Sequence, residues 1–179
     1  RLLRKEMPTL KVTALFDPNI DNTGGQTFKE EGLIEVLEGY KEQFGKTYTM
    51  PTHAAFKQDV ALRLAHKKPY NGKDFTKDKQ IDLLIVVNQM LTGFDSKWIN
   101  TLYVDKVMEY ENIIKAFSRT NRLFGPDKPF GVIRYYRYPN TMKRNIDKAV
   151  AMYSDNKPLK LFADPLTHNL QQMNSIYTE

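Results

Sequence analysis

The sequence contains no cysteine, only three histidines and one tryptophan, and no apolar run near the ~20 residues that cross a bilayer. Without cysteine there is neither a disulfide scaffold nor a zinc site built on thiolates, and the scattered His53, His66 and His168 lack the spacing of metal ligands. Residues 1–5 include no Met and no apolar signal-peptide core. We therefore expect a cytoplasmic chain without a membrane partner, cut from a longer protein.

The balance of residues is that of a folded domain with a basic surface. A length of 179 residues, with 41% hydrophobic and 27% charged positions, is typical of one compact globular domain with an appendage. Lys and Arg outnumber Asp and Glu by 27 to 21, which gives a net charge of +6. This excess favours a polyanionic partner, although many basic domains bind none.

The first half of the chain predicts a strand between helices. Thr27 with Glu30 forms a capping box that opens a helix, and Gly45 is placed to end it. Ile34 is among the residues expected to face the core from this helix. The elements predicted here are a helix end over residues 1–6, a strand over 10–16, a loop over 17–26, a helix over 27–44 and a helix over 52–66.

The second half predicts parallel strands joined by helices. The run 83–87 has five consecutive apolar residues, three of them β-branched, which is typical of a strand covered on both faces of a parallel sheet. The other elements predicted are strands over 102–104 and 131–136 and helices over 110–124, 140–153 and 166–177. Their order indicates an open α/β fold with helices flanking a parallel sheet.

Two polar segments follow these strands, where ligands of open α/β sheets gather. In the first, Gly93 lets a backbone amide approach a phosphate, Thr92 adds a hydroxyl, and Asp95 can accept from a ribose hydroxyl. In the second, Arg119 and Arg122 are predicted on neighbouring turns of the 110–124 helix, where two guanidinium groups can converge on one polyphosphate. On spacing alone, an ordinary turn is the favoured interpretation of the first segment and a solvated basic face that of the second.

The order of these segments carries a resemblance. The run 92–95 (Thr-Gly-Phe-Asp), the run 102–106 (Leu-Tyr-Val-Asp-Lys) and the run 116–122 (Ala-Phe-Ser-Arg-Thr-Asn-Arg) closely resemble the second RecA-like motor domain of the R subunit of type I restriction-modification enzymes. The close resemblance covers about residues 81–136. In superfamily 2 helicases and translocases the first run is similar to motif V and the last to motif VI, except that Lys115 stands in place of Gln and Ser118 in place of Gly.

The resemblance implies a RecA-like domain over residues 1–153 and the start of a C-terminal helical extension over 154–179. It implies that Thr92 and Gly93 touch the DNA backbone, and that Asp95 senses the nucleotide ribose or couples the two sites. It also implies that Arg119 and Arg122 reach the ATP phosphates, one of them as an arginine finger. The implied substrate is ATP with Mg²⁺. The implied partners are double-stranded DNA, a first RecA-like domain of the same chain, and the modification and specificity subunits.

The sequence lacks the remaining parts of a motor ATPase. The spacing Gly39 to Gly45-Lys46 has one residue too many for a phosphate-binding loop, and no Asp-Glu dipeptide occurs for Mg²⁺. We therefore expect another domain to hold the nucleotide. Two alternatives remain: the second motor domain of another superfamily 2 helicase, and a non-enzymatic nucleic-acid-binding module.

Three further features have open interpretations. The lysine-rich segment 67–80 is predicted to be a loop, and a solvated surface is favoured over a DNA-touching element. Trp98 is expected to anchor packing rather than to stack on a base. Asp105 is expected to pair with Lys106 or with the helix of the Arg119 segment.

Overall fold

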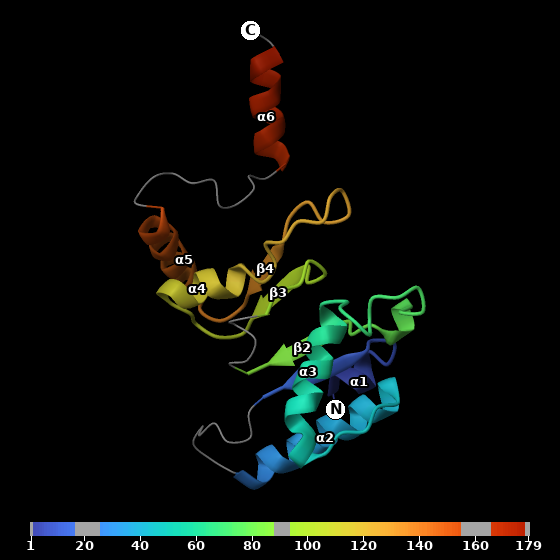
Figure 1. Ribbon diagram of the computed structural model, residues 1–179. Coiled ribbons are helices and arrows are strands. Elements are labelled where there is room, and N and C mark those ends of the chain that lie inside the picture. Colours follow the sequence, from blue (N-terminus) through green and yellow to red (C-terminus); the bar gives the residue numbers. More distant parts are fainter. Residues whose placement is uncertain (1, 17–25, 88–93, 155–165, 178–179) are drawn as a thin grey trace. The chain divides into compact units, whose positions relative to one another are not determined.

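The computed structural model describes residues 2–16, 26–87, 94–154 and 166–177. These residues form helices and short parallel strands, so the α/β class predicted from the sequence agrees with the structure (Figure 1). The chain divides into two compact units, residues 1–100 and 101–179, and each is described by itself. The predicted boundary after residue 153 coincides with the end of a helix and stays a prediction.

The first unit is built on one pair of parallel strands. Strand β1 (Val12–Leu15) pairs with β2 (Leu83–Val86), with Val12 opposite Leu83. The edge of β1 is closed by the side-chain amide of Gln43, which accepts from the Val12 N–H at 2.8 Å and donates to the Val12 carbonyl at 3.1 Å. A side chain thus completes the hydrogen bonding that a further strand would otherwise supply.

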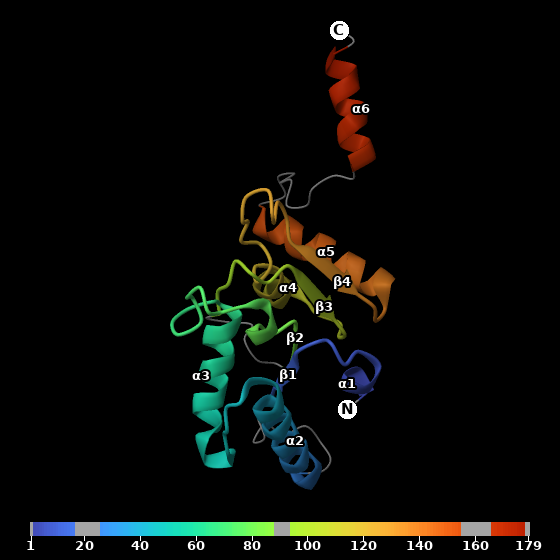
Figure 2. The ribbon, with the colours of Figure 1, turned by 90° about the vertical axis from the view of Figure 1, so that its right-hand side faces the viewer.

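Three helices accompany this strand pair. They are α1 (Leu2–Glu6), α2 (Gln26–Phe44) and α3 (His53–Leu64), and a short 3₁₀ turn, Met50–Thr52, leads into α3. Figure 2 shows α3 on one side of the strands and α1 on the other. A buried apolar core joins α2 and α3 to β1, and its members are Leu15, Leu33, Leu37, Tyr40, Phe56 and Val60.

The helices and strands predicted for this unit form within a few residues of their predicted bounds, with three differences. The loop predicted over 17–26 lies outside the described residues except for Gln26. Gly45 ends α2 with a φ of +70°, as predicted for a C-cap glycine. Helix α2 begins at Gln26, so Thr27 lies inside it rather than capping it, and Ile34 is exposed rather than in the core. The run 83–87 was expected to be covered on both faces, yet Ile85, Val86 and Val87 are 43%, 37% and 48% exposed. Among the described residues, β2 pairs only with β1, so the wide parallel sheet that such a run predicts is not seen there.

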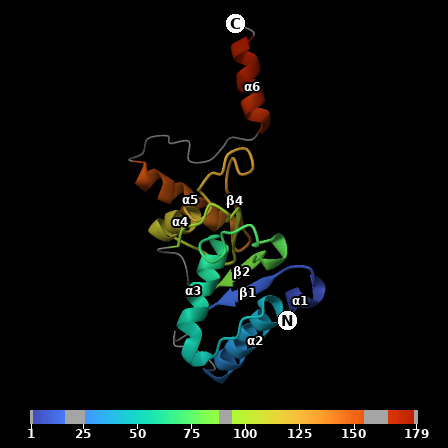
Figure 3. The ribbon, with the colours of Figure 1, turned by 45° about the vertical axis from the view of Figure 1, so that its right-hand side comes forward.

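The second unit contains another parallel pair, β3 (Thr101–Val104) with β4 (Val132–Tyr135). Helices α4 (Tyr110–Phe117) and α5 (Pro139–Tyr153) pack against each other beside these strands (Figure 3). At the end of β3, Val104 is buried whereas its neighbour Tyr103 is exposed, because successive side chains of a strand point to opposite faces. Helix α5 buries Met142, Ile146 and Ala149 as predicted, whereas Tyr153 is exposed. Helix α6 (Leu166–Tyr177) forms where the sequence predicts it.

The described strands form two separate parallel pairs rather than the single open sheet that the sequence analysis expects. Parallel pairing itself is confirmed in both units.

Candidate functional site

The segment that carries the two predicted arginines begins at the end of α4. The sequence predicts a helix through residue 124, but α4 ends at Phe117, so the prediction of two arginines on neighbouring helical turns is wrong. The Ser118 N–H donates to the Ile114 carbonyl at 2.9 Å, the Ser118 hydroxyl donates to the Lys115 carbonyl, and the Thr120 hydroxyl donates to the Phe117 carbonyl. Side-chain hydroxyls thus satisfy carbonyls of the last helical turn and stop the helix.

The turn after α4 is fixed against the start of β4. Thr120 is only 1% exposed, and it lies against Gly131, which directly precedes β4. A Cβ atom on Gly131 would lie 2.7 Å from both the Cβ and the Oγ1 of Thr120, and closer still to the Thr120 carbonyl oxygen. The arginine turn, residues 118–122, is therefore held by a close backbone approach that only glycine permits.

The two arginines flank this buried threonine in different ways. The Arg119 guanidinium donates to the Lys115 carbonyl at 3.1 Å and to the Ser118 hydroxyl at 2.8 Å, so it binds the end of its own helix. Arg122 is the more exposed of the two. Lys115 pairs with Glu111 at 3.0 Å, one helical turn away. The local geometry makes Arg122 the better candidate to reach a ligand.

We expect Gly131→Ala to destabilise the second unit by about 2 kcal/mol, because the new methyl group overpacks against Thr120. Urea unfolding of the 179-residue chain measures this change. Gly72→Ala is the matched control, because a Cβ at Gly72 would lie 4.0 Å from its nearest neighbour, the Asp74 backbone nitrogen. Equal stabilities of the two variants would contradict the tight contact.

The other predicted segment is described only from residue 94 onward. Thr92 and Gly93 lie outside the described residues, and Asp95 is exposed. Just beyond, the buried Ser96 donates its hydroxyl proton to the Leu64 carbonyl at 3.0 Å and accepts from the Trp98 N–H at 3.1 Å. The segment 94–98 is therefore tied to the C-terminal end of α3.

Trp98 packs against neighbouring side chains, as the sequence analysis predicts. Its ring stacks on the His66 ring with centroids 4.2 Å apart and planes 17° apart, and His66 also meets the edge of Phe75. Burial, followed by the charge of Lys97, lowers the pKa of the His66 imidazole. His66 is thus favoured as a neutral ring in this stack.

Asp105 has a partner that the sequence analysis missed. Arg137, just past β4, binds it through two guanidinium nitrogens at 2.9 and 3.3 Å, instead of the expected Lys106 or the Arg119 segment. The hydrogen bond from Arg137 lowers the pKa of the Asp105 carboxyl. Parallel pairing explains why Arg137 contacts Asp105, because the two residues follow the ends of paired strands, in which Val104 lies opposite Tyr135.

A buried polar cluster in the first unit was also missed. Asp59 on α3, whose side chain is 8% exposed, accepts from the Tyr40 hydroxyl at 2.6 Å, the Lys46 amine at 2.5 Å and the Tyr70 hydroxyl. Arg63 donates to both tyrosine hydroxyls, at 2.9 and 3.1 Å. We call these five residues the Asp59 cluster. An Asp and an Arg four apart on one helix were the only sequence signal for it.

The titration behaviour of the Asp59 cluster follows from its contacts. Burial raises the pKa of the Asp59 carboxyl, but the hydrogen bonds from Lys46, Tyr40 and Tyr70 outweigh this, so its pKa falls below 3.8. Burial lowers the pKa of Lys46, yet the hydrogen bond to Asp59 prevails and raises it to about 12. Burial also raises the pKa of the Tyr40 hydroxyl. Asp59 is therefore an anion held by three donors, a structural arrangement rather than a proton-transfer site.

Neither a metal-ligand cluster nor a membrane-spanning helix occurs among the described residues. No group of three or more His, Cys, Asp or Glu side chains in this part of the chain is placed to hold a metal ion. No helix within it is long and apolar enough to span a membrane.

Comparisons with known proteins match this chain to one family. The family model for domain 3 of the type I restriction enzyme subunit R matches residues 2–138. The endonuclease subunit of a type I restriction enzyme from Staphylococcus aureus (strain MRSA252) is 37% identical over 158 residues, which is 86% of this chain and 16% of the relative. A type I endonuclease subunit from Staphylococcus saprophyticus is 52% identical over 80 residues, 45% of this chain and 8% of the relative. The chain thus spans less than a fifth of the length of these relatives.

Proposed function

Because this chain belongs to the family of type I restriction enzyme subunit R domain 3, we propose that it is the second RecA-like motor domain of an ATP-dependent DNA translocase and endonuclease subunit. The observation that carries the proposal is the arginine turn after α4, which is fixed by the contact between Thr120 and Gly131. A rigid turn with an exposed guanidinium is suited to meet phosphate charge that another domain presents.

In this proposal Arg122 is the arginine finger. Its guanidinium has a planar fork of donors that matches phosphate oxygens and neutralises the charge that develops on the γ-phosphate. Arg119 binds the end of α4, so in this proposal it acts near the phosphates chiefly by keeping the turn in place. The triphosphate and its Mg²⁺ would be held by a first RecA-like domain, which supplies the metal chemistry.

The segment after β2 would serve the DNA side of the motor. Thr92 and Gly93 are proposed to contact the backbone of double-stranded DNA, and Asp95 to accept from the nucleotide ribose. The tie between Ser96 and the end of α3 supports this role, because it fixes the exit of the segment on a helix. Closing and opening of the two RecA-like domains around ATP would then step the protein along DNA.

The proposed enzyme works as part of an assembly. The complete subunit would combine this motor with a nuclease, and it would join the modification and specificity subunits, with the specificity subunit reading the DNA site. We propose the cytoplasm as its location.

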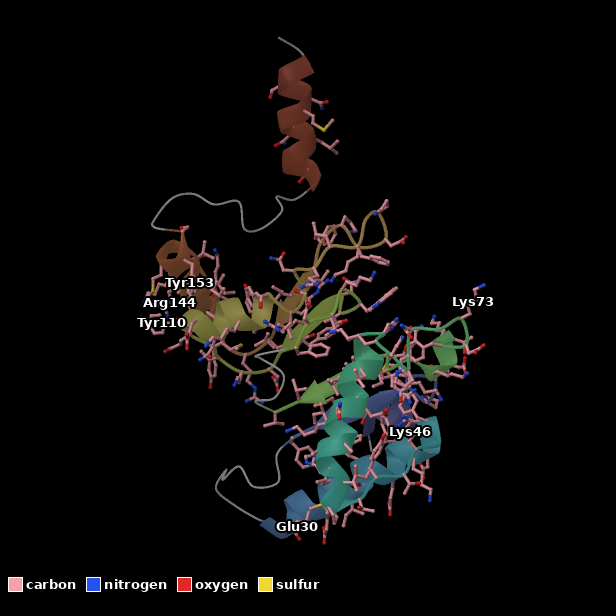
Figure 4. All side chains as sticks on the ribbon, in the orientation of Figure 1. Glu30, Lys46, Lys73, Tyr110, Arg144 and Tyr153 are labelled. Carbon is pink, nitrogen blue, oxygen red and sulfur yellow. The ribbon has the colours of Figure 1, made fainter. Side chains whose placement is uncertain are left out.

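Arg122→Lys in the complete subunit distinguishes a motor from a binding module. Lys keeps the charge but loses the bidentate fork, so we expect DNA-stimulated ATP hydrolysis to fall at least about tenfold. Arg144→Lys on α5, an exposed arginine (Figure 4), is the matched control and should hydrolyse ATP at the wild-type rate. Full activity of the Arg122→Lys variant would favour a non-enzymatic module that uses only the charge.

A further inference from the structure

We propose that the lysine loop, residues 67–80, together with Lys97, forms a separate surface that binds the phosphate backbone of double-stranded DNA. This inference rests on the proposed function for the identity of the polyanion. The surface carries the exposed lysines Lys67, Lys68, Lys73, Lys77, Lys79 and Lys97, against the exposed acids Asp74 and Asp78 of the same loop. The local excess of positive charge is what a sequence-independent phosphate contact requires.

The lysine loop is anchored by the Asp59 cluster. Tyr70, in the middle of the loop, is buried, and its hydroxyl donates to Asp59 and accepts from Arg63. Arg63 is only 4% exposed, and it also donates to the Lys79 carbonyl at 2.6 Å, at the far end of the loop. A buried guanidinium thus fixes the loop at two points. The backbone that carries the lysines is therefore already ordered, so the loop loses less conformational freedom when it binds a ligand.

Short contacts within the loop hold its shape as well. The Tyr70 N–H donates to the Lys67 carbonyl at 2.7 Å, and the Phe75 N–H donates to the Gly72 carbonyl at 3.1 Å. The Lys79 amine donates to the Asp74 carbonyl, so this lysine supports the loop locally. Lys73 points outward at the tip of the loop, away from the helices, as Figure 4 shows.

The stack of Trp98 on His66 brings the loop and the segment after residue 93 together. His66 precedes the loop directly, and Phe75 within the loop packs on the same imidazole. Lys97 lies with its amine 5.2 Å from the centre of the Trp98 ring. The charge of Lys97 therefore lies beside the loop, just beyond the segment proposed to touch DNA. Trp98, 42% exposed, offers an apolar surface next to these charges.

The chemistry of this surface favours duplex backbone as its ligand. Lysine amines are compact, strongly hydrated charges that contact phosphates without a fixed fork geometry. All six cations are lysines, so the surface suits a contact that must form and release along any sequence. The loop would thereby extend the DNA track beyond Thr92 and Gly93.

The test compares two double variants of the complete subunit. Lys68→Gln with Lys73→Gln removes two exposed lysines of the loop, and Lys143→Gln with Lys148→Gln removes two exposed lysines of α5 as a matched control. The readout is the affinity for a duplex of arbitrary sequence over a series of salt concentrations. We expect the loop variant to bind roughly tenfold or more weakly, and its plot of log affinity against log salt to be less steep by about 1 to 2. The control should match the wild type.

The outcomes separate this inference from the proposed function. Equal slopes for the loop variant, the control and the wild type would overturn the loop as a DNA contact and leave the motor proposal standing. A weaker affinity with an unchanged slope would overturn it too, because lost phosphate contacts must change the slope. A wild-type subunit that binds no duplex at low salt would overturn both proposals together.

Discussion

Arg122→Ala in the complete subunit should lower DNA-stimulated ATP hydrolysis by about a thousandfold while the affinity for ATP changes little. The reason is that an arginine finger meets charge that develops on the γ-phosphate during transfer, so its loss raises the barrier more than it weakens ground-state binding. Steady-state hydrolysis with saturating DNA gives the first quantity, and equilibrium binding of a fluorescent ATP analogue gives the second.

Two further variants make this result specific. Arg144→Ala on α5 removes another exposed arginine, one that donates to the Thr141 hydroxyl at 3.5 Å, and should leave hydrolysis unchanged. Arg119→Ala should have a smaller effect than Arg122→Ala, because Arg119 donates to the Lys115 carbonyl and the Ser118 hydroxyl. If Arg119→Ala alone abolishes hydrolysis, the assignment of the finger to Arg122 is wrong.

Asp59→Ala should destabilise the first unit by about 3 kcal/mol, the second large effect expected here. The substitution leaves the buried Arg63 without its carboxylate and deprives the Tyr40 hydroxyl of its acceptor. Removing one partner from a buried ionic cluster costs far more than the net strength of the cluster, because the remaining charge stays desolvated. Urea unfolding of the 179-residue chain, followed by the fluorescence of Trp98, measures the change, since Trp98 is its only tryptophan.

Two further variants test whether the loss of stability in Asp59→Ala comes from the Asp59 cluster. Asp74→Ala removes an exposed carboxylate of the lysine loop and should change the stability by less than about 0.5 kcal/mol. Tyr40→Phe removes one of the donors to Asp59 and should cost about 1 to 2 kcal/mol. Equal free energies of unfolding for Asp59→Ala and Asp74→Ala would contradict the claim that the Asp59 cluster stabilises the first unit.

The stabilisation by Asp59 should disappear in acid. Hydrogen bonds from Lys46, Tyr40 and Tyr70 hold the folded-state pKa of this carboxyl below 3.8 despite its burial. The contribution is therefore fully present above the unfolded-state pKa and is lost as the pH falls through the folded value. We expect the stability difference between the wild type and Asp59→Asn to be constant near neutral pH and to shrink below about pH 4. A difference that grows in acid would contradict this.

Most of the elements were predictable because their signals are local. Gly45 marks the end of α2 within a few residues, because it directly follows the apolar positions of that helix. The apolar run that contains Ile85 and Val86 likewise marks β2. The length of α4 was not predictable from periodicity, because Phe124 continues the apolar pattern after the helix has ended. What ends α4 is the set of hydrogen bonds from Ser118 and Thr120, together with a contact to Gly131 eleven residues further on.

The candidate site was predictable only in part for the same reason. Arg119 and Arg122 stand out by residue type and by resemblance, but the hydrogen bonds from Arg119 to Lys115 and Ser118 are contacts that spacing on an ideal helix does not describe. The Asp59 cluster was missed because its members are contributed by α2, α3 and two connecting segments, up to 30 positions apart from Tyr40 to Tyr70. Such clusters depend on tertiary packing, which residue patterns do not report.

The most direct test of the motor proposal is the distance from the Arg122 guanidinium to the γ-phosphate in a structure of the complete subunit with DNA and a non-hydrolysable ATP analogue. The proposal predicts a nitrogen to oxygen distance of about 3 Å, within hydrogen-bond range. A structure with the analogue bound and the domains closed, in which both Arg122 and Arg119 lie well beyond hydrogen-bond reach of the triphosphate, would contradict it.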